Sequence, residues 1–406
     1  MSEVGYGKLT VTGIARTAGV ANRTFYENFS GKEDCFLATY DLIVRNAARE
    51  VLAAHQQEEE PQAKVGAAIF AFLRAVAENP KAAHLILIEA PEVEAALERT
   101  PHTTGLFEAL VTKSFVAPPA SIQLPPAVAK GIVAGVSHTA RSCLLNRAEV
   151  DLAAESEELA EWALSLGSSA STRLSPPSRR PVAAALRPSR PPRANGFDSD
   201  YSPGDEREMI LWAVSRLAAG EGYRALTMPR IRSAVGISQR RFKQHFPTLA
   251  ECFLASLDLH YERLLAQPWA TATGAGRWQD RVYRTLAALC RELVDNPMLG
   301  KLLFLEVRNA GREGARWRAE MISGLSSSIY ATVPAKSRPN PLAAEASLAG
   351  VWAVLDAWVT GGQAQPPSQV AGAAAYLVLA PAIGAETAVE TIRAEQGARR
   401  TTEPAV

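Results

Sequence analysis

The chain has 406 residues, 47% of them hydrophobic, which describes a soluble globular protein long enough for two or three domains. Its 43 basic and 42 acidic side chains give a formal net charge of +1, so any nucleic-acid binding must come from a local concentration of charge. The four cysteines form no C-x-x-C pair, and no apolar stretch free of charge, Pro and Gly reaches the ~20 residues that span a bilayer. We therefore expect a cytoplasmic chain with no membrane segment.

The first predicted elements are two short helices, from Val11 to Thr17 and from Asn22 to Asn28, joined by a tight turn at Ala18-Gly19-Val20. Glycine suits such a turn because it enters left-handed backbone conformations without a side-chain penalty. The expected apolar seam consists of Ile14, Ala15, Val20, Phe25 and Phe29. This pattern predicts a helix-turn-helix whose second helix fits the major groove of DNA. A helical hairpin used only for packing is the alternative.

A long helix is expected after Ser30, since apolar side chains then recur at three- and four-residue spacing. Ser30 with Glu33, and Thr248 with Glu251, have the spacing of a capping box at a helix start. Further helices are expected at about 62–78, 80–88, 91–115, 126–146 and 151–166, and at about 277–295, 298–309, 312–332, 341–360 and 367–394. No convincing run of period-two alternation appears, so the sequence predicts an all-α fold.

The segment 167–204 is rich in Ser, Pro and Arg and is expected to be a linker, because its prolines prevent a continuous helix. From Arg173 to Arg193 it has six arginines and no acidic residue. Such a segment is expected to be extended and attractive to a polyanion, or to act only as a solubilising spacer.

The two sides of this linker repeat each other when the sequence is shifted by 217 residues. Between Gly5 and Leu42 the shift gives 15 identities in 38 ungapped pairs, far above chance. We therefore expect a tandem duplication of a helix-turn-helix head followed by a helical ligand-sensing and dimerisation domain. The expected units are a first head at 1–47, a first helical domain at 48–166, the linker, a second head at 205–258, a second helical domain at 259–395 and a disordered tail at 396–406.

An ordered set of motifs runs through the first head. It comprises Gly5-Tyr6-x-x-Leu9-Thr10-Val11, Ile14-Ala15, Ala18-Gly19-Val20, Thr24-Phe25-Tyr26-x-x-Phe29 and Lys32-Glu33. This stretch resembles the DNA-binding domain of the TetR family of bacterial transcriptional regulators. The resemblance implies a three-helix head on a helical regulatory domain, acting usually as a repressor that a small molecule releases from operator DNA. It also implies that Thr10, Tyr26 and Lys32 contact phosphates, while Arg23 and Thr24 reach base edges.

Each copy departs from the family pattern. The family's first helix should precede Gly5, where only four residues stand, so the first head is expected to be incomplete. The second copy has this helix, with Ile210, Leu211, Val214 and Leu217 at helical spacing after Asp205 and an end at Gly220. Its recognition helix has a better N-cap in Ser238, but Lys243 stands where the first has Tyr26, and Leu249-Ala250 replace Lys32-Glu33. The loss of these family residues argues against DNA contacts by the second copy.

Charge favours DNA binding by the second head. The window from Gly222 to Leu249 contains no acidic residue and six basic ones, which are Arg224, Arg230, Arg232, Arg240, Arg241 and Lys243. Such a cluster on a helix-turn-helix is the expected footprint of phosphate binding. The candidate DNA-contacting residues are Thr10, Asn22, Arg23, Thr24, Tyr26 and Lys32 in the first head and Thr227, Gln239, Arg240, Arg241 and Lys243 in the second.

The sequence thus predicts a ligand-responsive transcriptional regulator. Its expected partners are double-stranded operator DNA and a small-molecule effector of unknown identity. The two copies are expected to pair within one chain as a pseudo-dimer, or between chains as a homodimer. The alternative is a helical ligand- or partner-binding protein whose degenerate heads no longer bind DNA. No histidine has a metal-binding spacing and no catalytic motif occurs, so neither an enzyme nor a metal or cofactor site is expected.

Two further patterns concern the helical domains. Ala134-Gly135-Val136 and Ala349-Gly350-Val351 leave one helix face small enough for close helix packing, as a dimerisation bundle requires. Aromatic side chains could line a ligand cavity or belong to the plain core. They are Phe70, Phe72 and Phe107 in the first copy and Trp317, Tyr330, Trp352 and Trp358 in the second.

Overall fold

The computed structural model describes residues 6–116, 126–146, 152–167, 205–272, 276–331 and 333–402. Within these ranges every regular element is a helix and no strand occurs, which confirms the prediction of an all-α fold. The expected linker lies, apart from Gly167, outside the described residues.

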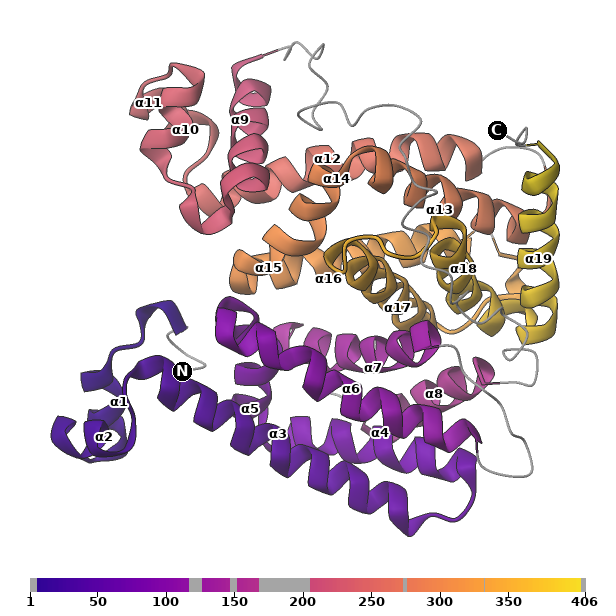
Figure 1. Ribbon diagram of the computed structural model, residues 1–406, viewed down its shortest axis with the longest axis horizontal. Coiled ribbons are helices and arrows are strands. Elements are labelled where there is room, and N and C mark those ends of the chain that lie inside the picture. Colours follow the sequence, from indigo (N-terminus) through magenta and orange to yellow (C-terminus); the bar gives the residue numbers. More distant parts are fainter. Residues whose placement is uncertain are drawn as a thin grey trace.

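The first half contains two short helices, a long one and five more (Figure 1). Its elements are η1 Tyr6–Lys8, α1 Val11–Ala18, α2 Asn22–Asn28, α3 Lys32–Gln57, α4 Pro61–Glu78, α5 Pro80–His84, η2 Leu85–Glu89, η3 Ala90–Glu92, α6 Glu94–Val116, α7 Pro126–Asn146 and α8 Leu152–Ser165. Of these, α4 and α6 pack on the long helix α3. The expected boundary between head and helical domain at residue 47 falls inside α3, which therefore belongs to both.

The second half follows a similar order after an additional first helix. Its elements are α9 Glu206–Glu221, η5 Tyr223–Ala225, α10 Met228–Val235, α11 Gln239–His245, α12 Leu249–Ala272, α13 Trp278–Asp295, α14 Pro297–Gly300, η6 Lys301–Glu306, α15 Val307–Asn309, α16 Gly311–Ala331, η7 Ala335–Ser337, α17 Pro341–Thr360, α18 Pro367–Ile383 and α19 Ala385–Thr402. The last helix, α19, has no counterpart among the described elements of the first half. In both halves a π-helical turn, η2 or η6, interrupts the helix that was expected to be continuous at 80–88 or 298–309.

Two expectations near the C-terminus differ from the structure. The helix expected at 367–394 is broken at Gly384, whose φ of +79° ends α18 and starts a new helix, α19. Glycine adopts this backbone conformation without steric cost. The helix α19 then continues to Thr402, beyond residue 396 where a disordered tail was expected. Residues 403–406 of that tail lie outside the described part of the chain.

One of the two predicted capping boxes is present in part. The Thr248 hydroxyl accepts a hydrogen bond from the Glu251 backbone N–H at 3.1 Å, as predicted, and the Glu251 carboxylate accepts from the Thr248 hydroxyl at 3.2 Å. The prediction for Ser30 is wrong, because α3 has Gly31 as its N-cap residue and no side-chain cap. Asp34 accepts bonds from both the backbone N–H and the hydroxyl of Ser30 instead of leaving them to Glu33.

The two halves lie side by side and pack through α7 and α17, which cross near their glycines (Figure 1). A methyl group at Gly350 would lie 3.0 Å from the Gly131 carbonyl oxygen and 3.1 Å from its Cα, so the backbones touch there. Polar bonds also join the halves: the Trp162 indole N–H donates to the Ser347 hydroxyl at 2.9 Å, and the Tyr376 hydroxyl donates to the Leu166 carbonyl at 2.9 Å. Helices α7 and α8 of one half thus pack on α17 and α18 of the other.

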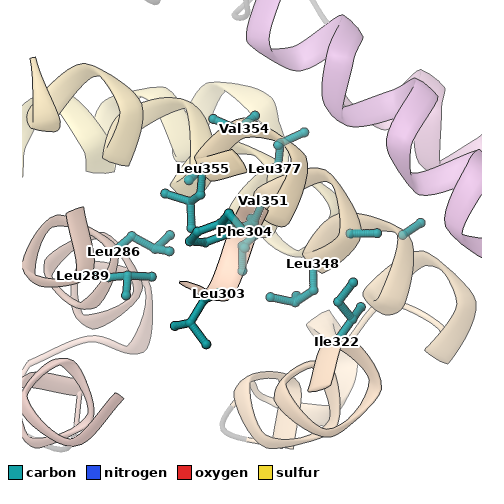
Figure 2. Packing of buried hydrophobic residues seen from close by; sticks show 14 of the residues in the cluster. Leu286, Leu289, Leu303, Phe304, Ile322, Leu348, Val351, Val354, Leu355 and Leu377 are labelled. Atoms are coloured by element: carbon teal, nitrogen blue, oxygen red, sulfur yellow. The ribbon is translucent and has the colours of Figure 1, made fainter. Parts of the chain in front are cut away.

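The main hydrophobic core includes residues of both halves and reaches into the second head. Figure 2 shows its centre, where Phe304 of η6 lies among Val351 and Leu355 of α17 and Leu377 of α18. Among the described helices α17 is long and apolar enough to cross a membrane by length and composition, but most of it is buried against its neighbours. Such burial is also expected of a core helix.

Candidate nucleic-acid interface

Each half has two short helices joined by a glycine turn at the place where a head was expected. In the first, Gly19 adopts a φ of +70° between α1 and α2, and Ala15 and Phe25 are buried beneath the turn. In the second, Gly236 adopts a φ of +77° between α10 and α11. The predicted turn chemistry is confirmed at Gly19, and the turn at Gly236 uses a left-handed glycine in the same way.

Side-chain caps fix where these helices begin. The hydroxyls of Thr10 and Thr227 accept hydrogen bonds from the backbone N–H groups of Gly13, at 3.1 Å, and Arg230, at 3.4 Å. Ser238 caps α11 in the same way, whereas α2 begins after Ala21 with no side-chain cap, as the sequence predicts. Both threonines are exposed and stand at the start of the helix that precedes the turn.

The second helix of the first head presents its predicted residues to solvent. Asn22, Arg23, Thr24 and Tyr26 are all exposed, with Tyr26 at 60% although it is aromatic. Arg23 forms an ion pair with Glu27 at 3.1 Å, and its side chain is 91% exposed. Exposed pairs of this kind contribute little stability, so Arg23 can exchange Glu27 for a phosphate or a base edge at small cost.

Lys32 is the exception among the candidate DNA-contacting residues of the first head, because it is half-buried. Its Nζ lies 4.7 Å from the centre of the Tyr6 ring and donates to the Leu9 carbonyl at 3.4 Å. These contacts tie the segment before α1 to the start of α3. Lys32 thus has a positioning role in the free protein, whatever it contacts in a complex.

In the second head, Gln239, Arg240 and Lys243 are exposed on α11 and line a shallow depression together with Gln244. Arg240 and Lys243 form no ion pair with any described residue. They are the side chains of this recognition helix best placed to meet phosphates.

Arg241 is held differently. Its Nε and Nη2 lie 3.1 and 2.7 Å from the two oxygens of Glu206 in α9, and the His245 ring nitrogen lies 2.9 Å from the same carboxylate. Carboxylates from outside the segment 222–249 therefore neutralise part of its positive charge. Besides Glu206, Glu221 pairs with Arg230, and Glu94 of α6 pairs with Arg224 at 3.5 Å. Sequence reasoning missed this neutralisation because these acids lie outside the window that was counted.

The two heads differ in how they are buttressed. In the second, α9 buries Ile210, Leu211 and Val214 against the other helices, as predicted, and its N-cap Asp205 accepts a bond from Glu208 N–H at 2.8 Å. In the first, Ala15, Phe25 and Cys35 form a separate small cluster. Val20, expected in the apolar seam, is 41% exposed, so that part of the prediction is wrong.

Both heads are attached to their helical domains by the same type of bond. A buried glutamate in each π-helical turn accepts the backbone N–H of the tyrosine that precedes the helix-turn-helix: Glu89 from Tyr6 at 3.0 Å and Glu306 from Tyr223 at 2.7 Å. Each tyrosine ring also packs on a phenylalanine, Phe36 or Phe253. The two anchors are related by the 217-residue shift found in the sequence.

The aromatic residues considered as cavity linings divide into three groups. Phe72, Phe107 and Trp352 line a cavity of about 690 Å³ between the two halves. Phe70 is 39% exposed, and the remaining three, Trp317, Tyr330 and Trp358, are buried core residues with bonded polar atoms. Within the described ranges no group of three or more His, Cys, Asp or Glu side chains is arranged to hold a metal ion.

Comparison with known families gives one finding for this interface. Residues 1–39 match the family model described as "Bacterial regulatory proteins, tetR family". The match spans α1, α2 and the start of α3, and it supports a helix-turn-helix of the TetR type in a DNA-binding regulator. A search of curated proteins found no match.

Proposed function

We propose that this protein is a transcriptional regulator that binds operator DNA through two helix-turn-helix heads on one chain. The observation that carries the proposal is the exposed polar face of α2 and α11, each presented by a left-handed glycine turn. The two heads project from the same end of the molecule (Figure 1), which suits simultaneous contact with one duplex. The family match to the first head supports the same function.

We also propose that the two halves are tandem copies that pair as an internal pseudo-dimer. Two observations support this pairing: the anchoring bonds of Glu89 and Glu306 obey one sequence shift, and α7 with α8 packs on α17 with α18. Pairing within one chain brings together two unlike recognition helices. The expected operator is therefore asymmetric, because operator symmetry mirrors the symmetry of the protein that reads it.

The proposed mode of action is repression relieved by a small molecule in the cytoplasm. The cavity between the halves supports a ligand-responsive role, since its volume of about 690 Å³ suits a small organic molecule. Its lining includes Ile86, Leu87 and Ile88 of η2, the turn that also contains the anchor of the first head. A ligand there would contact the element that positions that head.

Selection of bound fragments from random duplexes by the full chain tests this function. We expect an enriched asymmetric DNA sequence. Arg23→Ala should remove the sequence preference in one half of it, and Arg240→Ala should remove the preference in the other half. Arg316→Ala, an exposed arginine of α16 far along the chain from both recognition helices, is the matched control and should leave selection unchanged. No enrichment would contradict the proposal and favour the alternative of a ligand-binding protein with degenerate heads.

A further inference from the structure

The cavity between the two halves has walls from both. Helices α3, α4, α6 and α7 of the first half and α15, α16 and α17 of the second contribute to a space of about 690 Å³. Most of the wall is aliphatic or aromatic, represented by Ile43, Val51, Ile69, Phe72, Phe107 and Trp352. Cavities of this size and composition enclose small organic ligands with substantial apolar surface.

Three arginines face this apolar space, and they outnumber their carboxylates. Arg308 of α15 is paired with Asp356 of α17. Arg141 of α7 donates its Nε to the Leu87 carbonyl at 3.0 Å, a neutral acceptor. Within the described part of the chain no carboxylate lies in ion-pair range of Arg141 or of Arg318 in α16.

The remaining charged groups of the lining do not supply the missing anion. Lys130 is paired with Glu108 at 3.0 Å, and the His138 ring nitrogen lies 3.7 Å from Glu345. Glu50 is an exposed residue of the rim. Two guanidinium groups from opposite halves of the chain therefore share an apolar cavity, with no described carboxylate in ion-pair range of either and only the more distant Asp356 attracting Arg318.

Burial and mutual repulsion make the charged forms of Arg141 and Arg318 unfavourable. Burial, with repulsion from Arg318 and Arg308, lowers the pKa of Arg141 well below its usual range. Burial also lowers the pKa of Arg318 to about 10, despite the attraction of Asp356. Arg318 still carries its charge near neutral pH, and a buried charge is unfavourable until it is paired. An anion between the two guanidinium groups would offset the cost of burying their charges and would reduce the repulsion between them.

We propose that this cavity binds an organic monoanion with an apolar body, whose carboxylate or similar oxyanion group pairs with Arg141 and Arg318. The planar guanidinium group matches such an oxyanion with two parallel hydrogen bonds. The apolar body then lies among the aliphatic and aromatic residues of α3, α4 and α6. The ligand would supply the negative charge that neither half of the chain places beside Arg141 and Arg318.

The position of Arg141 connects this ligand with the first head. Arg141 holds the carbonyl of Leu87, and two residues later in the same π-helical turn Glu89 holds the N–H of Tyr6. Anion binding at this site does not require that the protein bind DNA. Its use as the effector site rests on the function proposed above.

Isothermal titration calorimetry on the full chain, without DNA, tests the site. The probes are decanoate and biphenyl-4-carboxylate, each compared with its neutral alcohol, 1-decanol and biphenyl-4-methanol. We expect at least one anion to bind 10-fold or more tightly than its alcohol. Arg318→Met should remove most of this preference, weakening that anion about 10- to 100-fold, because hydrogen bonds to charged groups contribute about 1.5–3 kcal/mol.

Control variants separate charge from folding. Arg316→Met, an exposed arginine of the same helix, should leave binding unchanged, and Arg318→Lys should retain part of the preference for the anion. Arg318→Met should melt no lower than the unmodified chain, because it removes an unpaired charge from an apolar cavity. The proposal is overturned if neither anion is preferred to its alcohol, or if Arg318→Met and Arg316→Met bind alike. Loss of DNA binding without loss of anion binding would count against the regulator and leave this site standing.

Discussion

The Glu89 carboxylate accepts the backbone N–H of Tyr6 at 3.0 Å, across 83 residues of sequence. Glu306 and Tyr223 form the same bond, again 83 residues apart. Both carboxylates are almost fully buried, at 4% and 3% exposure. A bond from an N–H to a buried carboxylate is stronger than one between neutral groups, so each head is oriented by its helical domain at one defined point.

Replacement of the second anchor should lower stability. Glu306→Ala removes the acceptor of the Tyr223 N–H and of the Asn309 side-chain amide, which lies 3.1 Å away, and leaves both donors unpaired. We expect a loss of about 2 kcal/mol in the free energy of unfolding. Urea denaturation measures this loss, with Glu306→Gln expected to lose less because its carbonyl still accepts. Equal stability of Glu306→Ala and the exposed control Glu313→Ala would show that the anchor contributes nothing.

Close packing of α7 on α17 should make Gly350 intolerant of even a methyl group. Gly350→Ala places its Cβ against the backbone of Gly131, which cannot move as a side chain could, and we expect a loss of about 1–3 kcal/mol. Gly324→Ala in α16 is the matched control, because nothing lies within 4 Å of its added Cβ. That variant should gain about 0.5–1 kcal/mol from higher helix propensity. Thermal melts in which both variants shift in the same direction would contradict this packing.

Release of Arg241 from Glu206 should strengthen DNA binding. Glu206→Gln weakens the hold on Arg241 and removes a negative charge beside α11, so an additional phosphate can be neutralised. We expect higher affinity at low salt and a slope of log K against log salt that is steeper by about 0.9. Fluorescence anisotropy over a salt series measures both quantities. Glu208→Gln, whose carboxylate lies 3.4 Å from Arg263 of α12, is the control. A slope no steeper for Glu206→Gln than for this control would refute the prediction.

Stability should fall with acid because of buried histidines. Burial, with repulsion from Arg263, lowers the pKa of His260 to about 3 from an ordinary 6.5, and its ring packs 5.1 Å from that of Trp212. The unfolded chain therefore binds more protons below pH 6.5, and the stabilisation is lost as pH falls from 6.5 toward 3. Between pH 7 and pH 5 the loss from this group is about 2 kcal/mol.

The variant His260→Gln isolates that contribution. Its stability should change less between pH 7 and pH 5 than that of the unmodified chain, although His55, His84 and His138 have lowered pKa values and keep part of the slope. His102→Gln, at an exposed position, should retain the full dependence. Urea denaturation at the two pH values gives the comparison, and an unchanged slope for His260→Gln would exclude this histidine as a source.

Local features of the fold were predictable because their causes lie within a few residues. Gly19 fixes the turn between α1 and α2, and Thr248 with Glu251 starts α12 by bonds that span three positions. The prediction of a Ser30 cap was wrong for a reason that is equally local. Asp34 competes with Glu33 for the backbone N–H and hydroxyl of Ser30, and one turn of helix brings it as near as Glu33.

Features that depend on long-range contacts were not predictable. The neutralisation of Arg241 requires Glu206 from a helix 35 residues earlier, and no periodic pattern records such a pairing. The shared cavity of Arg141 and Arg318 arises only when α7 packs beside the second half. In the sequence each is one arginine of a helix, and the absence of a counter-ion is visible only in three dimensions.

Native mass spectrometry of the chain on its selected duplex tests the central claim most directly. One chain with two unlike heads, paired internally, should give a complex of one protein and one duplex at micromolar concentration. Arg23→Ala and Arg240→Ala should each weaken this complex without changing its composition. A complex that forms only with two or more chains per duplex, or a chain that retains no duplex at all, would contradict the account.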